Sequence, residues 1–163
     1  SIEATLSQVD RVERLETGGT IANISPLDIC SLLRSAANNA GGVRISCPPE
    51  LPSAVADPAL LNIVIKNLLE NAVKYTDQPD SIEISAKAKS HTIEIVISNQ
   101  VTRPLRTPER LGEKYFRDTT GVGKPGSGLG LYIAKSFTQK MGGTLELKVD
   151  SAVFTANLTL QRP

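Results

Sequence analysis

The sequence predicts an α+β fold in which helices pack on a largely antiparallel sheet. Strand-like segments with alternating apolar residues come in adjacent pairs, first SIEISAKA (81–88) with TIEIVIS (92–98), then TLELKV (144–149) with AVFTANLTL (152–160). Helical patterns, in which apolar residues recur three or four apart, lie outside these pairs. Adjacent strands favour hairpins, whereas single strands alternating with helices would favour a doubly wound parallel sheet.

Composition limits the classes of function. The 163 residues include 18 Lys+Arg against 17 Asp+Glu and are 40% hydrophobic, which fits one globular domain. The near-neutral charge, without a basic run, argues against nucleic-acid binding, and no apolar stretch approaches the roughly 20 residues that cross a bilayer. Because no signal-peptide pattern opens the chain, we expect a cytoplasmic domain in which Cys30 and Cys47 are reduced core thiols.

Two helices are expected in the first quarter of the chain. Residues 1–17 form an amphipathic pattern whose apolar stripe needs a partner, and Gly18–Gly19 end it. Residues 26–40 form the second pattern, with Ser25 as the N-cap and Pro26 in the first turn.

Two further helices bracket a loop region. The longest pattern covers residues 58–76, with Asp57 as its N-cap. After the first strand pair, two prolines break residues 103–109, and a glycine-rich stretch runs over residues 121–130. This stretch leads directly into a helix over residues 131–141.

The long helix carries a polar stripe on a face that begins as apolar. Asn67, Asn71 and Lys74 share one azimuth at about 100° per residue, and Glu70 lies beside them. The same stripe is apolar one or two turns earlier, so it faces the interior. Two amides and an ammonium there form a cradle for a metal ion and a polyphosphate. The alternative is a solvated helix face.

The glycine-rich stretch is a second candidate for anion binding. Free backbone N–H groups before a helix, together with the helix dipole, favour an anion, and glycine lets the backbone approach it closely. A flexible hinge is the alternative. The residues concerned are Gly126, Ser127, Gly128, Leu129 and Gly130, with the loop cations Lys114, Arg117 and Lys124 available to complement phosphate charge.

Read together, DPALLNIVIKNLLENAVKYT (57–76) and GSGLGLYIAKSFTQKMGGTLEL (126–147) closely resemble the ATP-binding catalytic domain of bacterial sensor histidine kinases. This family is a branch of the superfamily that contains gyrase, the Hsp90 chaperone and MutL. The resemblance covers residues 25–160. It implies a two-layer α/β sandwich of the Bergerat type, with a mixed, largely antiparallel sheet and helices on one face.

The resemblance also implies the ligands ATP and Mg²⁺. Asn67 and Asn71 match the two asparagines of the family's asparagine motif, of which the second is usually the magnesium ligand. Lys74 matches the lysine that contacts phosphate, and Tyr75 matches the aromatic neighbour of the nucleotide.

The same resemblance extends to the lid and to the reaction type. Residues 111–117 (LGEKYFR) resemble the phenylalanine motif that begins the ATP lid, although Gly112 replaces a usual phenylalanine. Gly126, Gly128 and Gly130 match the second glycine motif. ATP-hydrolysing relatives have a water-activating glutamate where this chain has Asn67, and an amide cannot take a proton from water at neutral pH. We therefore expect phosphoryl transfer, not hydrolysis.

One motif departs from the family. Where the family has Asp-x-Gly-x-Gly around adenine, this chain has ISNQVTRPLRTPERL (97–111), so Asn99 stands in for the aspartate and the glycines are absent. A neutral amide accepts a weaker hydrogen bond than a carboxylate. It can also rotate to donate, so we expect weaker adenine binding and weaker discrimination against guanine.

The opening helix suggests what precedes the domain. LSQVDRVERLETG (6–18) resembles the end of the second helix of the family's dimerisation and phosphoacceptor hairpin, which divides the chain into residues 1–18 and an ATP-binding domain at residues 19–163. The hairpin's phosphorylated histidine is not in this chain, since the single histidine, His91, lies in an expected turn. No catalytic residue is therefore expected in this fragment.

The implied partners are the hairpin of the same protein and a response regulator, in a homodimeric and membrane-anchored full-length kinase. No nucleic acid and no membrane contact are expected for this fragment. Two alternatives stay open: a serine-kinase anti-sigma factor of the same superfamily, and an interaction domain that has lost nucleotide binding.

Overall fold

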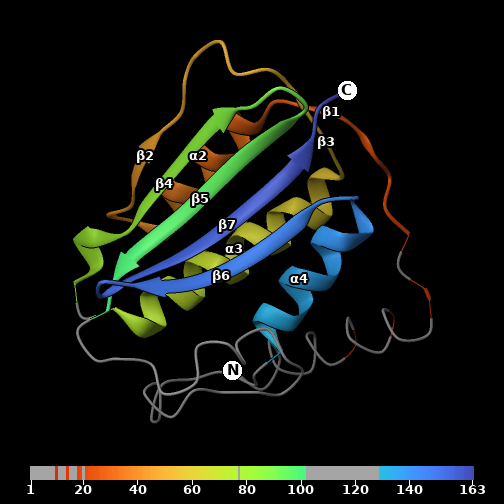
Figure 1. Cartoon of the computed structure of the whole chain (residues 1–163). Helices are drawn as coiled ribbons and strands as arrows, with labels where there is room; N and C mark the ends of the chain where they lie inside the picture. Colours follow the sequence, from red (N-terminus) through yellow and green to blue (C-terminus); the bar gives the residue numbers. More distant parts are fainter. Residues whose placement is uncertain (1–9, 11–13, 15–17, 20, 77, 102–128) are drawn as a thin grey trace.

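The computed structural model describes residues 10, 14, 18–19, 21–76, 78–101 and 129–163 (Figure 1). Its elements in chain order are β1 (Ser25–Leu27), α2 (Ile29–Ala40), β2 (Arg44–Ser46), β3 (Ala54–Ala56), α3 (Pro58–Tyr75), the 3-10 turn η1 (Pro79–Ser81), β4 (Glu83–Ala88), β5 (Thr92–Gln100), α4 (Gly130–Lys140), β6 (Thr144–Asp150) and β7 (Val153–Gln161).

The described strands form a five-stranded sheet and a separate two-stranded one. The large sheet has the order β2-β4-β5-β7-β6, in which only β2 pairs in parallel, with β4. β4–β5 and β6–β7 are the two hairpins that the alternating segments predict. The prediction of an α+β fold with a mixed, largely antiparallel sheet is confirmed.

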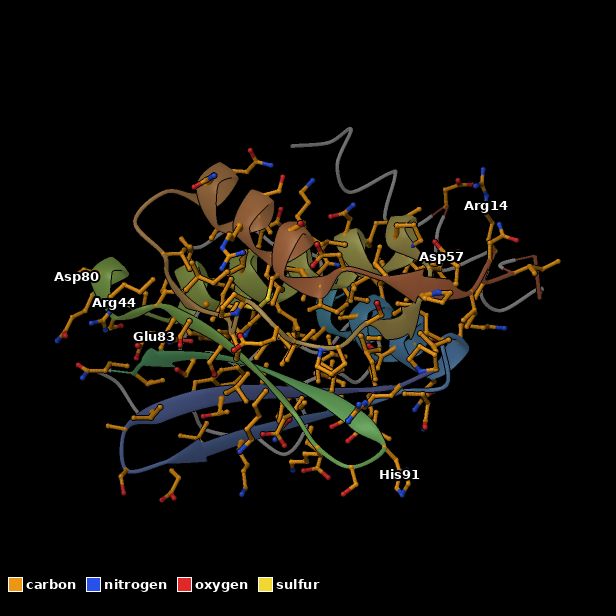
Figure 2. The ribbon with its side chains drawn as sticks, turned by 90° about the horizontal axis from the view of Figure 1, so that it is seen from above. Arg14, Arg44, Asp57, Asp80, Glu83 and His91 are labelled. Carbon is orange, nitrogen blue, oxygen red and sulfur yellow. A yellow bond between two sulfur atoms is a disulfide. The ribbon has the colours of Figure 1, made fainter. Side chains whose placement is uncertain are left out.

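The helices α2, α3 and α4 lie on one face of the large sheet, as Figure 2 shows from above. Alternation along β5 turns Ile93, Ile95 and Ile97 toward the helices, and each is at most 2% exposed. The opposite face carries mainly polar side chains, including Glu94. The core between the two layers is almost entirely aliphatic, as expected from a chain without tryptophan.

The start of the second helix differs from its prediction. Ser25 and Pro26 are not the N-cap and first turn of α2, because residues 25–27 form β1 and pair antiparallel with β3. The helix begins at Ile29, and Asp28 is its N-cap, whose side chain accepts a hydrogen bond from Ser31 N–H at 3.3 Å. Pairing with a distant strand has overridden the local Ser-Pro signal for a helix start.

Asp57 caps α3 as predicted and does more than cap it. Its Oδ1 accepts hydrogen bonds from the N–H groups of Ala59 (2.9 Å) and Leu60 (3.1 Å). Its Oδ2 accepts a hydrogen bond from Asn23 N–H at 2.8 Å, so both carboxylate oxygens have partners although the residue is only 6% exposed to solvent. This carboxylate, labelled in Figure 2, therefore ties the segment before β1 to the start of α3.

The two cysteines are not the reduced core thiols that the sequence suggested. Cys30, in the first turn of α2, and Cys47, directly after β2, form a disulfide with a Cα–Cα distance of 5.9 Å. The turn at Gly41–Gly42 reverses the chain, so that β2 returns past the start of α2 and brings the two residues together. Only the tertiary structure could reveal this proximity.

The end of the opening helix is partly described. Asp10 and Arg14 are helical and form an ion pair at 3.1 Å. Gly18 has φ +75°, and Gly19 N–H donates to Arg14 C=O at 2.7 Å, which is the Schellman ending that the glycine pair predicts. Within the described part of the chain, no helix is both long and apolar enough to span a membrane.

Candidate functional site

Two asparagines of α3 have enclosed amide groups without partners. Asn67 is 7% exposed, and Asn71, one turn later on the same stripe, is half-buried. The Nδ2 atom of each is inaccessible to solvent and has no hydrogen-bond partner among the described residues. Buried amides are normally satisfied, because an unpaired buried donor costs about 1–3 kcal/mol. The pair is therefore a candidate for contacting a ligand.

Asn99, near the end of β5, is a third enclosed amide. It is 2% exposed, its Nδ2 donates to the carbonyl oxygen of Gln100 at 3.2 Å, and its Oδ1 has no donor among the residues that the structure describes. Rotating the amide would bring Oδ1 against that carbonyl oxygen. The side chain is thus held with its oxygen available as an acceptor.

An aromatic contact joins the end of α3 to the start of β7, which pairs with the end of β5. Tyr75, the last residue of α3, stacks on Phe154 of β7 with ring centroids 6.4 Å apart and an angle of 22° between the rings. Phe154 is the ladder partner of Asn99. Lys74 Nζ lies 5.1 Å from the centre of the Tyr75 ring. The predicted residues Lys74, Tyr75 and Asn99 therefore gather at one end of the molecule.

The start of α4 lies toward the same side of the molecule (Figure 1). Leu129 is fully buried and precedes Gly130, the first residue of α4, whose helix packs against α3. The α4 N-cap position has no side-chain hydrogen bond. The other predicted phosphate-binding residues lie outside the described residues: Lys114, Arg117, Lys124, Gly126, Ser127 and Gly128.

Glu70 does not join the enclosed amides. Its carboxylate lies 3.9 Å from Lys66 Nζ on the exposed side of α3, and both side chains are more than half exposed. His91 lies in the β4–β5 turn, where Figure 2 labels it, and is exposed. Both side chains are exposed, unlike the enclosed amide atoms of Asn67, Asn71 and Asn99.

Sequence reasoning missed a pair of hydroxyl groups beside this site. Thr76, the C-cap of α3, is 5% exposed, and its Oγ1 lies 3.4 Å from Ser81 Oγ. Ser81 Oγ accepts a hydrogen bond from Gln100 N–H at 3.1 Å. The only available signal was the hairpin register, since counting back from the β4–β5 turn places Ser81 opposite Gln100.

The site offers neutral polar atoms instead of a cluster of charged ligands. Among the described residues, no group of three or more His, Cys, Asp or Glu side chains could hold a metal ion. The two described carboxylates with a clearly lowered pKa lie elsewhere. A hydrogen bond from Lys89 lowers the pKa of Glu94 on the open sheet face, and one from the Ser31 hydroxyl lowers the pKa of Asp28. The amide N–H donors of Asn67 and Asn71 suit a ligand that brings its own negative charge.

The fold is that of the ATP-binding catalytic domains of histidine kinases, and comparisons with known proteins agree. Residues 56–162 match the family described as "Histidine kinase-, DNA gyrase B-, and HSP90-like ATPase". The chain belongs to this family.

Similar curated proteins are sensor kinases. The chain is 29% identical to "Sensor protein QseC" of Escherichia coli over 147 residues, which are 87% of this chain and 31% of that protein. It is 30% identical to "Sensor histidine kinase CusS" of Escherichia coli over 114 residues, covering 68% of this chain and 24% of CusS. The chain thus spans about a quarter to a third of these relatives.

Solved structures share the fold. Full-length ShkA in complex with AMPPNP superposes with a TM-score of 0.71 at 22% identity, over 98% of this chain and 36% of ShkA. The catalytic domain of histidine kinase ThkA, in a nucleotide-free form, gives 0.70 at 16% identity, over 86% of this chain and 96% of that domain.

Proposed function

We propose that this chain binds Mg-ATP at the amides of α3 and β5 and presents its γ-phosphoryl group to a histidine outside the chain. The observation that carries the proposal is that three enclosed amide atoms of predicted site residues have no described partners: Nδ2 of Asn67, Nδ2 of Asn71 and Oδ1 of Asn99. Such atoms are costly in the free protein, and a polar ligand would satisfy them.

Each amide has a distinct role in this proposal. Asn71 offers an oxygen to magnesium and its N–H to the phosphates, which fits the preference of Mg²⁺ for oxygen ligands and for substrate phosphates. Asn67 donates to the phosphate region, and Asn99 accepts from the adenine amine. Lys74 complements the phosphate charge, with Arg117, Lys124 and the glycines 126, 128 and 130 as the remaining phosphate contacts. Magnesium, when bound, neutralises charge on the phosphates during transfer.

The chain's residues favour transfer over hydrolysis. In the reaction, a histidine nitrogen bonds to the γ-phosphorus while the bond from that phosphorus to the β–γ bridging oxygen breaks, and ADP leaves with the electron pair. Positioning and charge neutralisation supply most of the catalysis in such reactions. Asn67 cannot act as a base toward water, so ATP is held intact until the histidine arrives.

The wider protein is proposed by analogy with sensor kinases. Residues 1–18 are the end of the second helix of a dimerisation and phosphoacceptor hairpin, and the Schellman ending at Gly18 supports a boundary there. The full-length protein would be a homodimer, anchored in the bacterial inner membrane, that phosphorylates its own hairpin and then a response regulator. The catalytic domain itself would lie in the cytoplasm.

A transfer experiment tests the proposal. The 163-residue chain is incubated with radiolabelled Mg-ATP, alone and with the separately produced hairpin of the same protein. We expect acid-labile phosphate on the hairpin and none on the chain. Binding of Mg-ADP without transfer would limit the proposal to nucleotide binding, and absence of both would support an interaction domain.

A further inference from the structure

Ser81 continues the β4–β5 ladder with its side chain. Glu83 pairs with Ser98, so Ser81, two residues before the start of β4, lies opposite Gln100. The N–H of Gln100 donates to Ser81 Oγ at 3.1 Å. A serine hydroxyl thus takes the place that a strand carbonyl would occupy, and it holds the peptide group that joins Asn99 to Gln100.

The residue that Ser81 holds also orients Asn99. The carbonyl oxygen of Gln100 accepts the hydrogen bond from Asn99 Nδ2 at 3.2 Å. This carbonyl belongs to the next peptide group, whose N–H (that of Val101) donates to Ala152 C=O at 2.8 Å. As long as the backbone on both sides of Gln100 stays in place, Asn99 keeps its amide nitrogen toward the Gln100 carbonyl and leaves its oxygen free to accept. Ser81 thus holds the peptide group on the Asn99 side of Gln100, and the carbonyl on the other side of Gln100 orients the Asn99 side chain.

Ser81 is itself held from the α3 side. Its Oγ lies 3.4 Å from Thr76 Oγ1, and Thr76 is the C-cap of α3. Thr76 Oγ1 also accepts from Gln78 N–H at 3.0 Å. The hydroxyl pair links the end of the helix that carries Asn71 to the end of the strand that carries Asn99.

We propose that Ser81 is a positioning residue that keeps Asn99 as a hydrogen-bond acceptor and thereby sets the preference for adenine over guanine nucleotides. This inference rests on the proposed nucleotide binding. Adenine presents an amine donor where guanine presents a carbonyl acceptor, so a fixed Oδ1 accepts from the first and repels the second. If the amide could rotate, it would bind either base and lose the distinction.

The test compares three ligands on the 163-residue chain by calorimetry: Mg-ADP, Mg-GDP and Mg-pyrophosphate. Ser81→Ala should lower the ratio of ADP affinity to GDP affinity about threefold to tenfold, which corresponds to roughly one neutral hydrogen bond. Affinity for pyrophosphate, which has no base, should stay the same. Ser81→Thr keeps the hydroxyl and should restore the ratio. Ser85→Ala removes an exposed hydroxyl from β4 and should change nothing.

A double-mutant comparison separates positioning from general loosening. In an Asn99→Ala background, Ser81→Ala should leave the ADP-to-GDP ratio unaffected, since the group that it orients is gone. An unchanged ratio in Ser81→Ala alone, or an equal loss of pyrophosphate affinity, would overturn the role of Ser81. Failure of the parent chain to bind any of the nucleotides would instead overturn the proposed function. Asn99→Ala and its Ser81→Ala derivative are compared only with each other. A loss of stability in the Ser81→Ala single variant therefore does not affect this comparison.

Discussion

Asn71→Ala should weaken nucleotide binding strongly without weakening the fold. The Asn71 Nδ2 atom is enclosed and has no partner among the described residues, so its removal breaks no hydrogen bond that the structure describes. An unpaired buried donor costs about 1–3 kcal/mol, which offsets the packing lost with the side chain. We expect the free energy of unfolding without ligand to change by no more than about 1 kcal/mol.

The effect on ligand-induced stabilisation should be large. At a ligand concentration of about 100 times Kd, binding stabilises the parent by about 2.7 kcal/mol, and a domain of this size gains about 2–4 °C in Tm for each kcal/mol. The parent should therefore shift by about 5–11 °C with Mg-ADP. Losing an interaction with a charged ligand costs about 1.5–3 kcal/mol, so the stabilisation of Asn71→Ala at the same concentration should fall to about 0.3–1.3 kcal/mol.

Thermal unfolding with and without Mg-ADP measures both effects at once. Asn62→Ala is the matched control, because Asn62 is exposed on the same helix and the substitution is the same. It should retain the full ligand-induced shift. A full shift in Asn71→Ala, or loss of its fold in the absence of ligand, would refute the reasoning that assigns Asn71 to the ligand.

Three further predictions concern stability. Asp57→Ala should destabilise the domain by about 2 kcal/mol in urea unfolding, because it removes both bonds that cap α3 and the bond from Asn23, while Asp57→Asn should retain the cap. Glu94 has a pKa lowered by Lys89, so it stabilises the fold above the carboxyl's unfolded pKa, and this stabilisation is lost as pH falls through the folded pKa; Glu94→Gln should flatten that part of the stability profile. Reducing the Cys30–Cys47 disulfide, whose sequence separation is 17, should lower stability by about 3 kcal/mol in a melt with dithiothreitol.

One specific result would contradict each of these three stability predictions. Equal losses for the alanine and asparagine variants at Asp57 would mean that charge, and not capping, matters there. A Glu94→Gln profile identical to that of the parent between pH 3 and 5 would contradict the ion pairs on the open sheet face. A melting temperature that is the same with and without dithiothreitol would show that the disulfide does not constrain the unfolded chain.

The sequence could predict those features that depend on local chemistry. The Asp57-Pro58 helix start, the two hairpins and the glycine ending of the first helix depend on caps, alternation and backbone freedom, which short segments encode. The three-residue strands β1 and β3 were not predicted because so few residues show no period. Their pairing joins segments about 30 residues apart. The disulfide was missed for a related reason, since its two cysteines meet only after the turn between α2 and β2 forms.

The candidate site also has a part that the sequence predicts and a part that it does not. Helical geometry placed Asn67 and Asn71 on one stripe, and the family motif assigned Asn99 its place at the end of a strand. The link from Ser81 through Gln100 to Asn99 could not be predicted, because it requires the exact hairpin register and a side chain that replaces a backbone acceptor. The sequence analysis expects an Asn99 amide that can rotate, whereas in the structure the Gln100 carbonyl accepts from its Nδ2 and thereby orients it.

The central claim is that the enclosed asparagine amides of α3 and β5 contact a nucleotide. Side-chain amide signals in a ¹⁵N-labelled chain test it most directly, because each asparagine NH₂ group gives its own pair of signals that single substitutions can assign. Titration with Mg-ADP should shift the signals of Asn67, Asn71 and Asn99 with one common saturation curve and leave those of the exposed Asn62 in place. If these three amides do not respond at saturating nucleotide, the site lies elsewhere and the account is contradicted.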